Sequence, residues 1–488
     1  MPIVAFGFFW IAQTSHRYAA LWLGLASLFF YGWWNPQFVF LLLGSITFNY
    51  VMGYQIGHVR GQSLVKSKWI LTAAIVSNLA LLGYFKYTNF FIDTINQVSG
   101  TGWSISEIIL PLGISFFTFT QISFLVDVYR GIAKEYDFVH YLLFVTYFPH
   151  LIAGPVLHHK QMMPQFAETK TYKLNLHNVN IGLTIFSIGL FKKVVLADQF
   201  AQYSDPVFNM VAAGQEPQLL EAWIGALAYT LQLYFDFSAY SDMAVGLSKI
   251  FNVNLPINFY SPYKSANIIE FWRRWHMTLS AFLKDYVYIP LGGNRYGVSR
   301  RYINLLATML IGGLWHGANW TFVFWGGLHG VYLIINHGWQ GLSNKLSLPK
   351  SWYLNVMSVG ITFMAVVVAW VFFRAENFDT ALRMVNGMSG LNGLSLPMGP
   401  PDAISWLASY GVVYNGHAPM TQLPLKDILI WMPLGLAVVW FMPNCMQIAQ
   451  YVEERFRDAF LVGFIVGGVF LLTLMSFKKV SPFIYFQF

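Results

Sequence analysis

Apolar residues run along this chain in long blocks and not in the dispersed period of about 3.6 residues that marks a surface helix. Blocks long enough to cross about 30 Å of hydrocarbon as helices lie at 19–34, 36–57, 69–87, 105–127, 178–197, 222–248, 352–373, 428–443 and 460–477. A further pair, 302–318 and 320–336, is interrupted at Gly317. The pattern therefore predicts an all-α polytopic membrane protein with about eleven transmembrane helices.

Two stretches depart from this pattern. Residues 138–157 are apolar, but Pro149, Gly154 and Pro155 interrupt them. Such breaks are tolerated at membrane depth only where neighbouring protein satisfies the freed backbone groups, so we expect a re-entrant element here. Residues 374–427 contain Gly and Pro and predict an extracytoplasmic cap with weak structure. Nothing else suggests a boundary, and we expect a single membrane domain over 1–488.

The composition agrees with a lipid environment. The chain is 56% hydrophobic and 10% charged, whereas soluble domains carry about 25% charged residues. The net charge of +8 could indicate nucleic-acid binding in a soluble protein. In a membrane protein the ordinary source of that charge is an excess of Lys and Arg on cytoplasmic loops, so no nucleic-acid partner is expected. A single cysteine, Cys445, excludes an intramolecular disulfide and a cysteine metal cluster.

Loop charges predict an orientation. Residues 58–68 carry basic but no acidic side chains and should be cytoplasmic, whereas 88–104 and 198–221 lack Lys and Arg and should face the other side. Residues 264–301 should also face the cytoplasm, because Glu270 and Asp285 are outnumbered there by Lys264, Arg273, Arg274, Lys284, Arg295, Arg300 and Arg301.

His316 is the sharpest candidate for chemistry. It lies between two apolar segments and beside Gly317, and ionisable residues in membrane segments are costly and are functional candidates by default. Burial favours the neutral imidazole that a general base requires. Spacing alone leaves a structural histidine, bonded to a neighbouring helix, equally open. Trp315 and Asn319 are candidate substrate-binding residues; packing is the alternative for Asn319.

A second block covers residues 270–280. If it forms one helix, Trp272, Trp275 and Leu279 share a face, while Arg273 and Arg274 point elsewhere. This pattern is typical of an interfacial amphipathic helix near lipid phosphates, so a membrane anchor is one interpretation. The other is that these arginines, with the nearby His276, bind a phosphate-bearing acyl donor.

Other polar clusters have weaker signals. Asp236 and Asp242 are poorly spaced for a metal on a regular helix, so we expect hydrogen-bonding or salt-bridging roles. His150, His158 and His159 have irregular spacing with no carboxylate or thiol near, so no metal site is expected.

Several motifs are missing from the sequence. It has no G-x-S-x-G elbow, no phosphate-binding G-x-x-x-x-G-K-[ST] loop and no H-E-x-x-H zinc helix. No bound cofactor is therefore expected. The small-xxx-small pattern from Gly326 to Gly330 predicts helix packing.

Five blocks of the sequence make it similar to the bacterial membrane-bound O-acyltransferase (MBOAT) family, in particular to its alginate O-acetylation branch. The blocks are LPLGISFFTFTQISFLVDVYRG (110–131), FPHLIAGP (148–155), LYFDFSAYSDMAVGL (233–247), EFWRRWHMTLSAFLKDYVYIPLGGNR (270–295) and GGLWHGANWTFVFWGGLHG (312–330). They follow the family's order and span most of the chain.

The resemblance implies a fold of many helices around a central funnel or tunnel lined by re-entrant elements. It implies that His316 is the active-site histidine and His276 a second, supporting one. It further implies a multi-pass protein of the bacterial inner membrane that takes acetyl from a cytoplasmic donor, acetyl-CoA. The acetyl group would pass to a periplasmic acetyltransferase partner or to the polymer, within a polysaccharide biosynthesis complex, and O-acetylate an exopolysaccharide such as alginate or cellulose.

Two departures from the family pattern affect these expectations. The His158-His159-Lys160 stretch differs from typical alginate enzymes, so cellulose or another exopolysaccharide is an alternative and peptidoglycan a less favoured one. Relatives usually begin with a further dozen or so residues before the start seen here at Met1, so we expect a truncated first helix or a misassigned start.

Two rival functions stay open. One is D-alanyl transfer to teichoic acid, which shares the fold and histidines. The other is a polysaccharide or lipid transporter without chemistry, which would not need both histidine blocks. We also expect His276 and His316 to meet in space, since a histidine within hydrocarbon needs a polar partner or a water-filled cavity.

Overall fold

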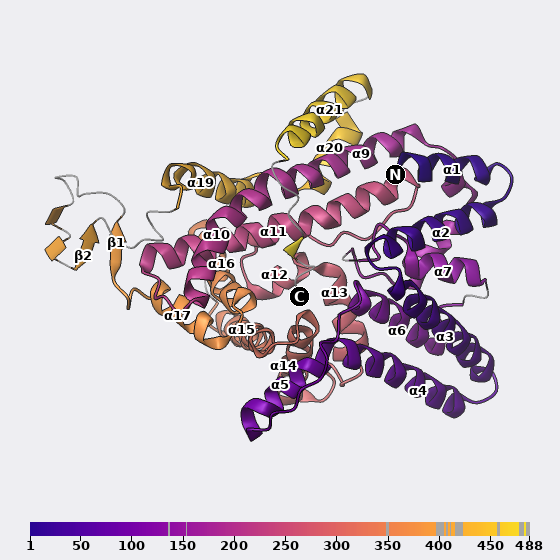
Figure 1. Ribbon diagram of the computed structural model, residues 1–488, viewed down its shortest axis with the longest axis horizontal. Coiled ribbons are helices and arrows are strands. Elements are labelled where there is room, and N and C mark those ends of the chain that lie inside the picture. Colours follow the sequence, from indigo (N-terminus) through magenta and orange to yellow (C-terminus); the bar gives the residue numbers. More distant parts are fainter. Residues whose placement is uncertain are drawn as a thin grey trace. The chain divides into compact units, whose positions relative to one another are not determined.

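The computed structural model is helical in both of its compact units (Figure 1). One unit comprises residues 1–189, 240–258 and 448–469, and the other comprises residues 190–239, 259–447 and 470–488. The structure describes residues 1–134, 137–152, 154–347, 351–396, 405–406, 408–409, 411–414, 423–455, 459–477 and 483–484.

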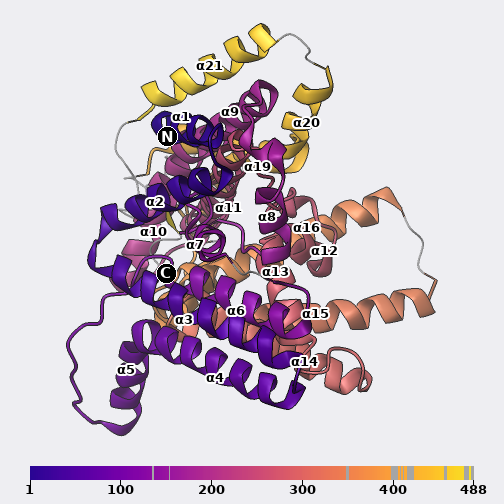
Figure 2. The ribbon, with the colours of Figure 1, turned by 90° about the vertical axis from the view of Figure 1, so that its right-hand side faces the viewer.

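The first unit is built mainly from the N-terminal helices. Its elements are α1 (Pro2–Ala12), α2 (His16–Trp34), α3 (Gln37–Arg60), α4 (Leu64–Leu82), the π-helix η1 (Gly83–Tyr87), α5 (Thr88–Ser99), α6 (Ile114–Arg130), α7 (Phe138–Thr146), α8 (His159–Phe166), the 3-10 helix η2 (Thr169–Tyr172) and most of α9 (Leu176–Phe191). Helices α3, α4 and α6 pack against one another and lie side by side in Figures 1 and 2.

Polar contacts join these three helices. Asn49 of α3 and Asn78 of α4 exchange amide hydrogen bonds of 3.0 and 2.7 Å, and both side chains are buried. Gln121 of α6 donates to the Ser45 hydroxyl at 2.9 Å. Because apolar burial gives little driving force between helices in lipid, such interhelical hydrogen bonds are an ordinary way to hold them together.

The second unit contains the blocks that carry the candidate chemistry. Its elements are η3 (Lys192–Ala197), α10 (Asp198–Ala212), the first part of α11 (Leu219–Ile250), η4 (Pro262–Lys264), α12 (Ile268–Arg274), α13 (Met277–Leu283), η5 (Lys284–Tyr288), α14 (Gly297–His316), α15 (Trp320–Lys345), α16 (Trp352–Arg374), α17 (Phe378–Met388), β1 (Leu394–Leu396), β2 (Val412–Tyr414) and α19 (Leu425–Phe441). Helices α20 (Cys445–Arg455) and α21 (Ala459–Met475) have residues in both units. The two strands pair in parallel, with Leu394 opposite Val412.

Helices α14 and α15 form a closely packed hairpin (Figure 2). A Cβ atom added to Gly313 would lie 2.2 Å from the carbonyl oxygen of Phe322, and one added to Gly326 would lie 2.3 Å from that of Met309. Only glycine lets the two backbones approach this closely. At Gly330 an added Cβ would meet Leu306 at 2.8 Å. The predicted packing role of Gly326 and Gly330 is therefore confirmed.

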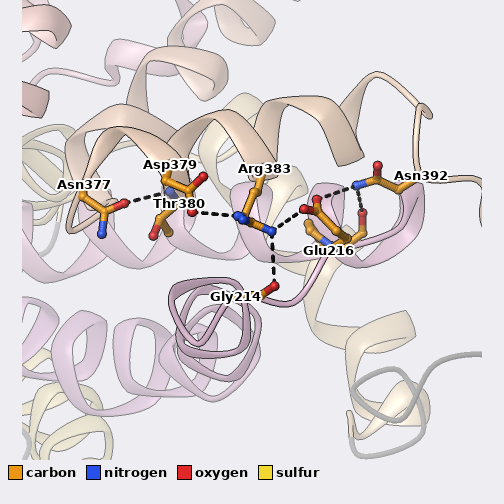
Figure 3. Close-up of polar contacts among 8 residues, drawn as sticks. Gly214, Glu216, Asn377, Asp379, Thr380, Arg383 and Asn392 are labelled. Carbon is orange, nitrogen blue, oxygen red and sulfur yellow. Dashed lines mark hydrogen bonds and ion pairs between the residues drawn. The ribbon is translucent and has the colours of Figure 1, made fainter.

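The stretch 374–427 is better ordered than we expected where the structure describes it. Asn377 caps α17 by accepting the N–H of Thr380 at 2.9 Å. Further along α17, Arg383 bonds to Asp379 at 2.7 Å, to the carbonyl of Gly214 at 3.2 Å and to Glu216 (Figure 3). These contacts attach α17 to the loop between α10 and α11. The expectation of weak structure is wrong for α17; residues 397–404, 407, 410 and 415–422 lie outside the described ones.

Fewer helices meet a length and composition test for membrane spans than the sequence suggested. Within the described residues four do, and up to five if one bent pair is counted as a span. They are Gln37–Arg60, Leu64–Ser99, Leu176–Ala212 and Trp352–Arg374, with the bent pair Lys426–Phe441 and Cys445–Glu454. All five coincide with predicted blocks, so an all-α membrane architecture is confirmed and the count of about eleven is not.

The stretch 138–157 does not form a continuous spanning helix. Helix α7 ends at Thr146, and turns, including a bond from the Gly154 N–H to the His150 carbonyl, precede α8. With 9 residues, α7 is too short to cross a bilayer. The predicted interruption is confirmed, although Ala153 lies outside the described residues.

Candidate functional site

His316 is the last residue of α14, and the sharp connection to α15 follows it. Gly317 is extended, and a Cβ atom there would lie 2.1 Å from the Phe322 ring. Asn319 then begins α15 by accepting the Thr321 N–H at 3.0 Å. The predicted break at Gly317 is confirmed, and the group that approaches it closely is the Phe322 side chain.

Aromatic rings surround the His316 imidazole, which is 5% exposed. The ring centroids of Trp315, Trp325 and Phe373 lie 5.0, 5.1 and 5.2 Å from it, all in edge-to-face arrangements. Such walls exclude water, and electrostatic interactions are stronger in a water-poor site.

His276 occupies a break between two short helices. Helix α12 ends at Arg274 and α13 begins at Met277, while His276 has φ of +43°. A left-handed conformation is uncommon for a residue other than glycine and is often found at functional sites. Residues 270–280 are therefore not one helix, and the interpretation that placed them on a single face is wrong.

The two histidines lie together. Their ring centroids are 6.2 Å apart, and the centroid of Phe237 lies 4.8 Å from that of His276. The prediction that the two blocks meet is confirmed. His276 is 0% exposed and lies outside the candidate spans; burial lowers its pKa to about 3, so its imidazole is neutral near pH 7.

The apolar side chains of the same block face protein and not lipid. Trp275 and Leu279 are 2% and 1% exposed. Trp275 packs against Trp370 with centroids 4.8 Å apart. The indole N–H of Trp272 donates to Nδ1 of His329 at 3.3 Å. The membrane-anchor interpretation of this block is therefore wrong, because its large side chains form part of the core of the second unit.

The remaining candidate site residues lie in different surroundings. Trp315 faces both histidines, with its centroid 6.1 Å from that of His276. Arg273 is exposed, whereas Arg274 pairs with Glu270 at 2.6 Å. Asn319 uses both ends of its amide for backbone bonds, since its Nδ2 also donates to the Glu376 carbonyl at 2.6 Å. This favours the packing alternative for Asn319.

Asp236 has the salt-bridging role that the sequence predicted. Its Oδ1 lies 2.7 Å from the amine of Lys193, and its Oδ2 accepts the Ile484 N–H at 2.9 Å. Lys193 also lies 2.9 Å from Asp198. The buried charge is therefore compensated inside the second unit.

The three other histidines that we considered have local partners. The His150 ring nitrogen Nε2 lies 3.1 Å from the carbonyl of Phe144, His158 caps α8, and His159 packs on Phe124. In the part of the chain that the structure describes, no group of three His, Cys, Asp or Glu side chains is arranged to hold a metal ion.

Sequence reasoning gave no site role to several residues around the histidines. Trp325 and Phe373 contribute to the walls of the His316 site, and His329 is fully buried between Trp272 and Trp325. The GGLHG run around His329 was noticeable in sequence, but no spacing rule connects Phe373 of α16 with His316.

This chain is similar to known membrane-bound acyltransferases. The model of MBOAT, the membrane-bound O-acyltransferase family, matches residues 114–374, which contain both histidines. A peptidoglycan O-acetyltransferase of Helicobacter pylori is 44% identical over 517 residues, covering 100% of this chain and 95% of that protein. A probable alginate O-acetylase of Pseudomonas aeruginosa is 44% identical over 77% of this chain and 70% of its own length. A teichoic acid D-alanyltransferase of Streptococcus thermophilus is 28% identical over 54% of this chain and 68% of its own length.

Proposed function

This chain belongs to the membrane-bound O-acyltransferase family, and we propose that it transfers acetyl groups from a cytoplasmic thioester donor for the O-acetylation of a polysaccharide outside the cytoplasm. Membership makes it an O-acyltransferase and a multi-pass membrane protein. The donor proposed is acetyl-CoA, and the location proposed is the bacterial inner membrane. The immediate acceptor would be a periplasmic acetyltransferase or the polymer itself.

The pair formed by His276 and His316 is the observation that carries this proposal. Both imidazoles are buried, their centroids are 6.2 Å apart, and the two come from sequence blocks on either side of η5. A protein that only transports a polysaccharide has no use for two buried imidazoles within an aromatic enclosure. An acyltransferase needs a general base, and a neutral imidazole in a water-poor site can accept a proton from a hydroxyl group.

We propose that His316 is that base. Its ring nitrogen removes the proton of the acceptor hydroxyl while the hydroxyl oxygen attacks the thioester carbonyl carbon. Collapse of the tetrahedral intermediate breaks the C–S bond, and the thiolate leaves with the proton that His316 took up. His276, uncharged near pH 7, positions the His316 ring without adding a competing positive charge.

The polymer is an extracytoplasmic polysaccharide, for which two candidates have support. Alginate is the polymer named for the Pseudomonas aeruginosa relative, and peptidoglycan is named for the Helicobacter pylori relative, which matches 100% of this chain. That full-length match raises peptidoglycan from the less favoured alternative that the sequence blocks indicated to a candidate beside alginate. D-alanyl transfer is less favoured, because the relative that names it is 28% identical over 54% of the chain.

Isotope transfer in a reconstituted system tests the proposal. The full chain would be placed in proteoliposomes with ¹⁴C-acetyl-CoA outside and either alginate or peptidoglycan strands present, with and without the periplasmic partner. Base-labile label on one polymer is the expected result. Label transferred from a D-alanyl carrier protein but not from acetyl-CoA would contradict the proposal, as would normal transport of unmodified polymer without thioester consumption.

A further inference from the structure

A polar pocket lies at α12, the helix that ends two residues before His276, within the second unit. Its volume is about 440 Å³. Asn267, Glu270 and Arg273 line it from α12 and its N-terminal cap, and His337 and Gln340 line it from the end of α15. None of the steps proposed for His316 uses Asn267, His337 or Gln340, so this pocket has no role in the chemistry described above.

Two arginines of α12, Arg273 and Arg274, accompany the pocket's one carboxylate, Glu270. The carboxylate of Glu270 is occupied: one oxygen pairs with Arg274 at 2.6 Å and the other accepts the Ala266 N–H at 3.0 Å. Arg273 forms no ion pair with any carboxylate among the described residues, although it lines the same pocket. Its guanidinium is therefore available to an anionic ligand.

A second guanidinium stands behind the pocket wall. Nη2 of Arg301, near the start of α14, lies 2.7 Å from Nδ1 and 2.9 Å from Nε2 of His337. Near Glu270, the charge of its partner Arg274 acts on Lys264: burial lowers the pKa of Lys264, and the charge of Arg274 lowers it further. Basic groups thus lie close enough together to repel one another, and an anion would relieve this repulsion.

The amide side chains add neutral donors. Oδ1 of Asn267 accepts the Glu270 N–H at 3.0 Å, so its NH₂ group is the end left to face a ligand. Gln340 is exposed and lines the opposite wall. A planar guanidinium flanked by amide N–H groups matches the geometry of phosphate oxygens.

We propose that this pocket binds a terminal phosphate group of the acyl donor, an inference that rests on the proposed function. A nucleotide thioester such as acetyl-CoA carries a phosphate monoester, with about two negative charges near pH 7. A phosphopantetheine arm attached to a carrier protein carries only a phosphodiester. The pocket would therefore select the free nucleotide thioester over a carrier-bound donor.

Binding of two related ligands tests this site. The full-length protein would be placed in nanodiscs of zwitterionic phosphatidylcholine and titrated with coenzyme A and with dephospho-coenzyme A, which lacks the 3′-phosphate. Wild type should bind coenzyme A roughly tenfold more tightly than the dephospho form. Arg273→Ala should remove this preference, weakening coenzyme A binding and leaving dephospho-coenzyme A binding unchanged.

A matched control and a lipid arm complete the design. Arg295→Ala removes an exposed arginine that does not line the pocket and should leave both affinities unchanged. Equal affinity of wild type for both ligands, or equal weakening of both by Arg273→Ala, would overturn the site while leaving acetyl-CoA as the donor. Failure of wild type to bind coenzyme A would overturn the proposed donor as well. In anionic nanodiscs, wild type and Arg273→Ala would also be compared for the phosphatidylglycerol that stays bound to each protein. If Arg273→Ala binds coenzyme A as wild type does but loses bound phosphatidylglycerol, the pocket holds a lipid phosphate and the donor assignment is overturned.

Discussion

Gly326 of α15 faces Gly313 of α14 so closely that a Cβ atom added to Gly326 would lie 3.1 Å from the Gly313 Cα and 2.3 Å from the Met309 carbonyl oxygen. This contact fixes the hairpin in which His316 is the last residue of α14. The position of the proposed base thus depends on two residues without side chains.

Gly326→Ala should destabilise the protein by about 1–3 kcal/mol, because backbone atoms cannot move aside as a flexible side chain can. Helix propensity alone would favour alanine by about 1 kcal/mol. Gly338→Ala is the matched control, since it lies on the same helix and nothing is within 4 Å of its added Cβ. Thermal unfolding in detergent checks both; a Gly326→Ala variant as stable as Gly338→Ala would contradict the close contact.

His276 should make stability depend on pH in one direction. Its pKa is lowered to about 3 by burial, while the unfolded chain has a histidine pKa of about 6.5. Below the unfolded value the unfolded state binds a proton that the folded state does not, so stability is lost as pH falls from about 6.5 towards the folded pKa. The slope is about 1.4 kcal/mol per pH unit.

His276→Asn is the variant that isolates this effect, because asparagine tolerates the left-handed backbone and does not titrate. Its unfolding temperature, compared with wild type from pH 7 to pH 4, should fall less steeply. Parallel curves for the two proteins would show that His276 is not buried as a neutral group.

Surface labelling checks the predicted orientation of residues 264–301. Ser299→Cys places a thiol at an exposed position in the first turn of α14, and the natural Cys445 is buried. Ser299 is preferable to the neighbouring Gly297, whose φ of +86° would strain a cysteine. A membrane-impermeant maleimide should label this thiol only from the cytoplasmic side. Labelling from the periplasmic side alone would contradict the predicted orientation of residues 264–301 and the placement of the donor on the cytoplasmic side.

Local sequence features predicted the parts of this site that depend on residue type. The helical blocks and the break at Gly317 followed from apolar runs and a glycine. The proximity of His276 to His316 followed from the cost of burying an imidazole together with the resemblance to the family. The break at His276 did not, because a left-handed residue that is not glycine leaves no sequence signal when tertiary contacts impose it.

The predicted number of membrane spans is not confirmed, for a related reason. An apolar run has the same pattern whether protein or lipid covers it. Helix α11 was expected to span over 222–248, yet the buried residues of that block include Thr230 and Asp236. The same limit applies to Trp275 and Leu279, whose spacing fits a membrane surface as well as the protein interior in which both are buried.

The most direct test of the account is acetyl transfer by His316→Ala. Purified wild type and His316→Ala, in matched proteoliposomes with ¹⁴C-acetyl-CoA and acceptor, would be compared with His58→Ala, which removes an exposed histidine of α3. The expected rate is roughly 10²–10⁴-fold lower for His316→Ala, with unchanged unfolding temperature and a normal rate for His58→Ala. A folded His316→Ala protein that transfers acetyl at a near-normal rate would contradict the assignment of His316 as the base.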